Sequence, residues 1–73
     1  MRTKLYLSPH PDGGWLGREE GHEHFLVVGQ DKKEVLDHLL NYADQNRPCD
    51  IIIQNENGDF MEERTLGTRH FPL

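Results

Sequence analysis

The sequence of 73 residues contains a single cysteine, Cys49, so neither an intrachain disulfide nor a thiolate metal cluster can form within one chain. Secreted domains of this size usually depend on disulfides, and their absence favours the cytoplasm. The sequence also lacks an apolar stretch of transmembrane length, and the apolar run near Met1 is too short for a signal peptide. We therefore expect a cytoplasmic protein that does not enter a membrane.

Positive charge is scarce as well. Eight lysine and arginine residues face 13 aspartate and glutamate residues, which gives a net charge of −5. A protein that binds duplex nucleic acid is expected to show a basic stripe, and none is visible. No phosphate-binding glycine loop and no Ser-His-Asp order stands out. Nucleic-acid binding is therefore a disfavoured alternative, and an enzyme is not expected.

Apolar residues make up 34% of the chain, which is enough for one modest core. A chain of this length forms one domain. We expect a single compact domain over residues 1–64, because the apolar periodicity is lost beyond that point. Residues 65–73 form either a frayed tail or an arm whose Phe71 docks on the domain.

The spacing of apolar residues predicts five strands and one helix. Alternation or β-branched runs predict strands over residues 3–8, 15–20, 25–28, 50–54 and 59–64. Asp31 to Glu34 has the form of a capping box, and an apolar stripe follows it, so a helix is predicted over residues 32–46. Two glycines after Pro11 and the pair Asn57-Gly58 predict hairpin turns.

The order β-β-β-α-β-β predicts an α+β fold in which an antiparallel sheet of four to five strands has one helix packed on one face. The other face is then either polar or hidden by a partner. Three consecutive isoleucines, residues 51–53, send apolar side chains to both faces, so Ile52 or its two neighbours need a second cover. A second copy in a homodimer, a curled sheet or Phe71 could supply it.

The run LSPHPDGGW from Leu7 to Trp15, followed by Glu20-Gly21, resembles the opening of the bacterial domain of unknown function 2188 family. The stretch DKKE at 31–34 and the stretch leading to NGDF at 57–60 are similar to that family too. The resemblance implies a small bacterial domain with no established activity, so it supports the fold and not a mechanism. The helix here has leucines where the family's helix is richer in alanine, which implies a different partner surface.

The loop from Pro9 to Trp15 is the candidate functional feature, because a rigid turn that presents His10 and Asp12 beside Trp15 could grip a ligand. The alternative is that proline and glycine shape a hairpin while Trp15 fills the core. The residue types favour this alternative, since each has an adequate explanation in a turn.

The histidines near residue 22 and the single cysteine are further candidates for reactive sites. His22 and His24 have Glu20 and Glu23 nearby, but their spacing matches no closed zinc pattern, so we expect solvated histidines and no metal or other cofactor. Cys49 has no visible base, which is typical of an inert, half-buried thiol.

The function that the sequence favours is a non-enzymatic protein-interaction or regulatory module that acts through the sheet face or an exposed strand edge. Its partner is an unidentified protein or, in a homodimer, a second copy. A nucleic-acid-binding module is the alternative, and the acidic net charge opposes it.

Overall fold

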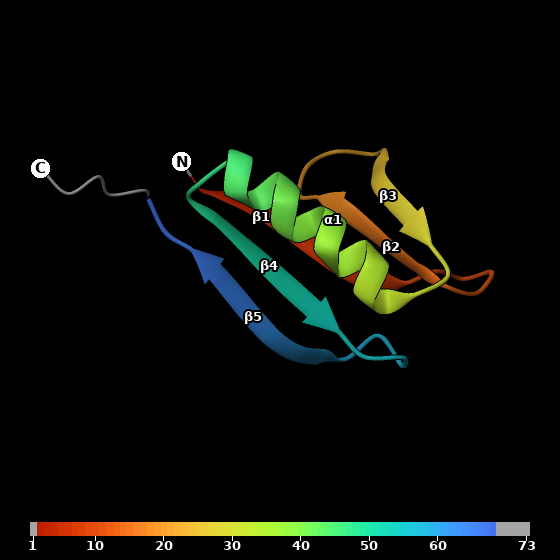
Figure 1. The fold of residues 1–73 in the computed structure, drawn as a ribbon. Coiled ribbons are helices and arrows are strands. Elements are labelled where there is room, and N and C mark those ends of the chain that lie inside the picture. The colour runs from red at the N-terminus through yellow and green to blue at the C-terminus, as the bar shows by residue number, and fades with distance from the viewer. Residues whose placement is uncertain (1, 69–73) are drawn as a thin grey trace, which may run out of the picture.

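Six elements follow one another in the order that the sequence predicts. In the computed structural model, which describes residues 2–68, five strands form one sheet and a single helix lies across one of its faces (Figure 1). The elements are β1 (Thr3–Pro9), β2 (Trp15–Glu19), β3 (Phe25–Gly29), α1 (Lys32–Gln45), β4 (Cys49–Gln54) and β5 (Phe60–Leu66). The predicted α+β class, strand number and helix are confirmed.

The sheet has the strand order β3-β2-β1-β4-β5 and is mostly antiparallel. Short turns join β1 to β2, β2 to β3, and β4 to β5, so each of these pairs is antiparallel. The pair β1–β4 is parallel, because α1 carries the chain from β3 at one edge across the sheet to a place beside β1. The predicted antiparallel sheet therefore contains one parallel pair at its centre.

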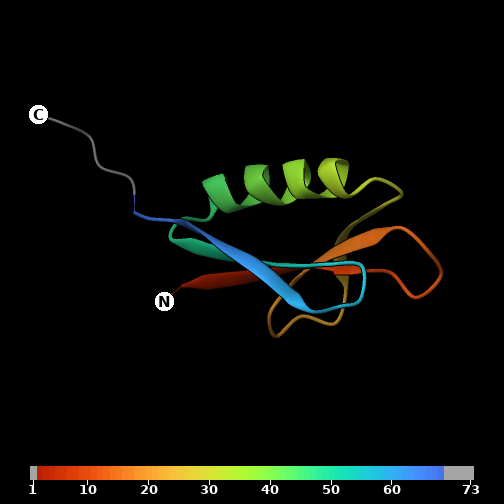
Figure 2. The ribbon, with the colours of Figure 1, turned by 90° about the horizontal axis from the view of Figure 1, so that it is seen from below.

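The core lies between α1 and the central strands. In the parallel pair, Leu5 is the partner of Ile51 and Leu7 is the partner of Ile53, and all four side chains are buried. Val35, Leu39 and Ala43 of α1 cover them. Figure 2 shows α1 on one side of the sheet and no described element on the other. We call this second side the open face.

A glycine allows the helix to lie close to β2. Gly17 is the register partner of Leu7 and of Val27, and a Cβ atom at this position would lie 2.6 Å from Leu39 Cδ2. Trp15 shares this covered face, as predicted, but it is half-buried and does not fill the centre of the core. Lys32 Nζ lies 4.7 Å from the centre of its ring. Leu39 fills the space above Gly17, so the Trp15 indole packs at the margin of the core.

The ends of the helix and of β5 are fixed by polar contacts. Asp31 Oδ1 accepts a hydrogen bond from the Lys33 backbone N–H at 3.4 Å, as expected of a helix N-cap. After the helix, Arg47 Nη1 donates to the carbonyl oxygen of Gly67 at 3.1 Å. β5 continues past the predicted boundary at residue 64, since Leu66 packs against the core. The predicted docking of Phe71 lies outside the described residues.

None of the helices in residues 2–68 is long and apolar enough to cross a membrane.

The contact between Leu39 and Gly17 predicts a pair of coupled stability changes. Leu39→Ala should cost about 2–5 kcal/mol, because it removes a fully buried side chain and leaves a cavity. Gly17→Ala should cost about 1–3 kcal/mol through overlap with Leu39. Gly17 has no positive φ, so alanine adds no backbone strain. In the double variant the new methyl group enters the cavity, so the two costs should not add.

Urea denaturation of the four proteins measures these free energies of unfolding. Asn41→Ala is the matched control, because Asn41 lies on the exposed side of the same helix. Strict additivity, or a Leu39→Ala variant as stable as the parent, would show that α1 does not pack on Gly17 as described.

Candidate functional site

The three residues of the predicted site, His10, Asp12 and Trp15, do not lie together in the structure. Within the turn, His10 Nδ1 accepts a hydrogen bond from the Asp12 backbone N–H at 3.0 Å, and Asp12 is exposed. The His10 ring meets Phe25 edge-on, with ring centres 6.1 Å apart. Trp15 instead faces α1 and contacts Lys32. His10, Asp12 and Trp15 therefore do not converge on one ligand, and His10 contributes to the surface around β3.

Strand β3 is the most apolar exposed segment of the described chain. Phe25, Leu26 and Val28 expose 50%, 40% and 53% of their surface, and none of the five residues of β3 carries a charge. The strand pairs with β2 on one side and forms an edge of the sheet on the other. An edge strand presents unpaired backbone N–H and C=O groups to a partner. The apolar run from Phe25 to Val28 predicted this strand, but its place at the edge follows only from the strand order.

The opposite edge, β5, has a different character. Its central residues are Glu62, Glu63 and Arg64, and Arg64 Nη2 lies 3.8 Å from Glu62 Oε1. The pairing with β4 is also irregular next to Ile53. Charged side chains hinder the addition of another strand, and they distinguish β5 from β3, whose pairing with β2 is irregular too. Among the described residues on this side, the exposed large apolar side chains are Phe60 and Met61, where the strand begins.

The open face carries a polar cluster on its central strands. The Arg18 guanidinium carbon lies 5.1 Å from the centre of the Tyr6 ring. The Tyr6 hydroxyl donates to Glu20 Oε1 at 3.0 Å, and this hydrogen bond raises the pKa of Tyr6. Ile52, beside Tyr6 in the register, is half-buried. The face is thus neither wholly polar nor wholly apolar, since Phe25 and Val28 lie on its β3 side and Phe60 on its β5 side.

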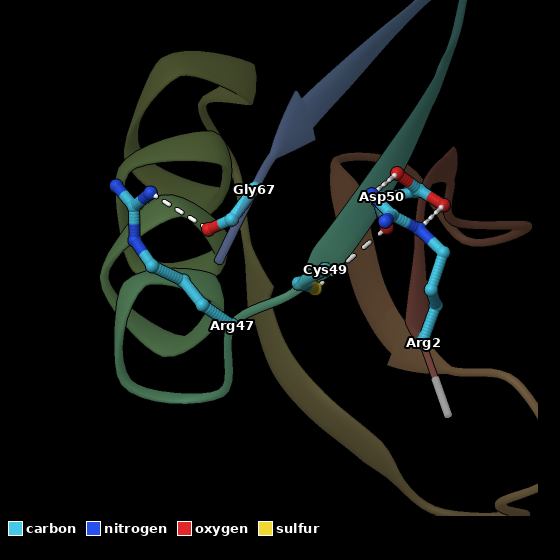
Figure 3. Close-up of polar contacts among 5 residues, drawn as sticks. All are labelled: Arg2, Arg47, Cys49, Asp50 and Gly67. Carbon is cyan, nitrogen blue, oxygen red and sulfur yellow. Dashed lines mark hydrogen bonds and ion pairs between the residues drawn. The ribbon is translucent and has the colours of Figure 1, made fainter. Parts of the chain in front are cut away.

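An ion pair between Arg2 and Asp50 lies at one end of the open face (Figure 3). Arg2 Nε donates to Asp50 Oδ2 at 3.0 Å, and Arg2 Nη2 donates to Asp50 Oδ1 at 2.8 Å. This bidentate contact holds the pKa of the Asp50 carboxyl below its ordinary value. The neighbouring Cys49 points into the core and is fully buried, more than the half-burial that we expected. Burial raises the pKa of its thiol, which keeps the thiol protonated and unreactive.

One histidine of the β2–β3 connection, His22, has a structural contact. His22 Nε2 lies 3.4 Å from Glu19 Oε2, while the Tyr42 hydroxyl of α1 donates to Glu19 Oε1 at 2.6 Å. The hydrogen bond to Glu19 raises the pKa of Tyr42. Across residues 2–68, no group of three or more histidine, cysteine, aspartate or glutamate side chains is placed to hold a metal ion. Through these two contacts, Glu19 links the β2–β3 connection to α1.

Two hollows lie along α1 on the side of β3. A groove of about 250 Å³ runs between the helix and the strand, and a hollow of about 390 Å³ lies on the polar surface of the helix. Leu26, Val27, His38, Leu39 and Tyr42 line the groove, and Glu34, Asp37, His38 and Asn41 line the hollow. The two spaces share His38, so an apolar groove and an acidic surface adjoin each other.

Comparison with known proteins gives little further information. No family model matches the chain, and no solved structure matches it. A stretch of 38 residues, 52% of this chain, is 47% identical to part of the plasmodial-specific protein LAV1-2 of Physarum polycephalum. The match covers 11% of that protein, so the chain spans about a tenth of the relative's length. The resemblance to the bacterial domain family therefore stays a prediction.

The contact between Arg2 and Asp50 predicts how acid destabilises the protein. Because the folded pKa of Asp50 is lowered, its contribution to stability is present above the ordinary value of 3.8 and is lost as the pH falls through the folded pKa. Asp50→Asn should lower the free energy of unfolding at neutral pH and reduce its decline in acid. Asp12→Asn, at an exposed turn residue, is the control.

Urea titrations between neutral pH and about pH 2 measure both effects. If Asp50→Asn and the parent lost stability with the same pH dependence, the ion pair would have no part in acid unfolding.

Proposed function

We propose that this protein is a non-enzymatic protein-interaction or regulatory module that binds a partner protein through β3. The observation that carries the proposal is the distribution of exposed apolar residues. Within residues 2–68, three of the five large apolar side chains that are exposed belong to the five residues of β3. Concentrated apolar surface of this kind marks interaction sites, and here it coincides with an unpaired sheet edge.

The polar groups support a binding role rather than catalysis. Asp50 is held by Arg2, and Glu19 accepts from Tyr42, so these carboxylates act within the fold. The proposal keeps the cytoplasmic setting, with which a single buried thiol is compatible. It also keeps the resemblance to the bacterial domain of unknown function 2188 family, whose members have no established activity.

A nucleic-acid-binding module is the second candidate. The open face presents Tyr6 beneath Arg18, with Phe25 as the register partner of Arg18, and aromatic rings on a sheet can stack with unpaired bases. The net charge of −5 opposes this reading, because affinity for phosphate backbones comes mainly from basic side chains. We rank it below the protein-interaction module for that reason.

Affinity capture from the native cell extract should depend on β3. Phe25→Ser/Val28→Ser removes two apolar side chains that are half exposed, so it should abolish capture of the specific partner while the fold persists. Phe60→Ser is the matched control, because it removes an aromatic side chain that is even more exposed than Phe25 from the other edge. The captured proteins are identified and quantified by mass spectrometry.

The extract is divided, and one half is treated with nuclease. Capture that disappears after nuclease treatment would favour the nucleic-acid module. If the β3 variant and the Phe60 variant captured the same proteins as the parent, the proposed role of β3 would be wrong.

A homodimer on the open face is the second form of the proposal. Phe60 lies at one side of this face and Val28 at the other, so a two-fold axis that runs along the strands, between two facing sheets, would bring Phe60 of each copy towards Val28 of its partner. The charges here have both signs, since Arg18 and Lys4 alternate with Glu20 and Asp50. Two copies can therefore approach without strong repulsion.

Light scattering coupled to size exclusion, over a dilution series, tests the homodimer. We expect the mass to rise above 8.5 kDa at high protein concentration and to fall on dilution. Phe60→Ser should weaken the association. A mass of 8.5 kDa at every concentration would exclude the dimer and leave the β3 surface for a different protein.

A further inference from the structure

The pairing of β3 with β2 is irregular, and two consecutive residues of β3 line the groove beside the helix. The register shifts between Gly17 and Arg18, so Phe25 pairs with Arg18 and Leu26 has no partner of its own. In a regular strand Leu26 and Val27 would face opposite sides of the sheet. Both instead line the groove beneath α1. The unpaired edge of β3 therefore lies next to an apolar groove.

The size of the groove suits side chains rather than a whole small molecule. Its volume of about 250 Å³ is below the roughly 300–1,000 Å³ of pockets for small ligands. A strand added to β3 would point alternate side chains to the helix side of the sheet, where the groove lies. Its backbone would pair with the outward N–H and C=O groups of β3.

The charge beside the groove indicates what this strand contains. Glu34 and Asp37 lie on the exposed surface of α1 and line the hollow that adjoins the groove at His38. No ion pair joins either carboxylate to another residue in the described part of the chain. A basic side chain next to the apolar one would meet these two carboxylates.

We infer that β3 accepts an extended segment of another protein as an additional strand, and that this segment places an apolar side chain in the groove and a lysine or arginine on Glu34 and Asp37. The inference rests on the proposed function and specifies its partner. Main-chain hydrogen bonds supply affinity in this mode of recognition, and the groove and the carboxylates supply specificity.

A second copy of this chain is the less suitable occupant of the β3 edge. Antiparallel pairing of β3 with itself places both helices on the same side of a continuous sheet. The acidic surfaces around Glu34 and Asp37 would then face each other across the interface, in copies that each carry a net charge of −5. A basic segment meets the same surface with the opposite charge, so charge complementarity selects it.

Selection from a random peptide display library, with the folded protein as bait, tests the inference. We expect enriched peptides to combine alternating apolar residues with lysine or arginine and to contain few acidic residues. The best peptide is synthesised, and fluorescence anisotropy gives its Kd for the parent and the variants. NMR amide shifts should change at β3 and along the groove side of α1, and should be small on β5.

Two variants and one matched control separate the parts of the inference. Leu26→Ser/Val28→Ser should weaken binding at least about tenfold through loss of apolar contact. Glu34→Gln/Asp37→Asn should weaken it about three- to tenfold and reduce its sensitivity to salt. Glu62→Gln/Glu63→Gln makes the same change in net charge on β5 and should leave the Kd within about twofold. Thermal melts confirm that each variant is folded.

The outcomes distinguish this inference from the proposed function. Peptides without a preference for basic residues, bound equally well by the Glu34/Asp37 variant, would overturn the inference while capture through β3 could still stand. Failure to enrich any peptide would also overturn it. Amide shifts on concentrating the protein alone would overturn it in favour of a second copy if they appeared at β3 and not at Phe60, because the open-face homodimer would shift both. If the Leu26/Val28 variant also bound as the parent does, the role of β3 in the proposed function would be excluded.

Discussion

The approach of Leu39 to the backbone of β2 at Gly17 determines how the helix lies on the sheet. Without a Cβ at Gly17, the Leu39 side chain reaches the strand and α1 can cover Leu5, Leu7, Ile51 and Ile53 together. The other features of the covered face follow from this placement. Trp15 is left at the margin against Lys32. One helix of 14 residues covers the central strands and leaves both edges accessible.

Local patterns predicted the elements because each carries its own signal. The helix was recognisable from Asp31 and from an apolar stripe, and the β4–β5 turn from Asn57-Gly58, where Gly58 has a φ of +85°. The parallel pair β1–β4 was not predicted, because alternation within a strand says nothing about its neighbour. The role of Gly17 was missed for a related reason. A glycine adds nothing to an apolar pattern, although its missing side chain sets the helix position.

The candidate site, too, could not be predicted from local sequence patterns alone. His10, Asp12 and Trp15 are close in sequence, but the strand geometry sends Trp15 to the covered face while His10 meets Phe25. Composition could identify a rigid turn but not the side of the sheet to which each residue belongs. The exposure of β3 was equally hidden, because an apolar run such as Phe25 to Val28 reads the same in a central strand and in an edge strand. Strand order, which depends on contacts distant in sequence, makes the difference.

The edge strand β5 carries charged side chains and the edge strand β3 carries apolar ones, and the packing of the core does not require this difference. β5 shows that this fold tolerates charged side chains along an edge, since Glu62, Glu63 and Arg64 are exposed while Leu66 still packs against the core. On β3, Val27 alone packs against the core, and Phe25, Leu26 and Val28 each expose about half of their surface. Polar residues at these three positions would preserve the core and would protect the edge from association. The core therefore does not require the apolar side chains of β3, and a partner that covers this strand, as we propose, would give them a physical reason.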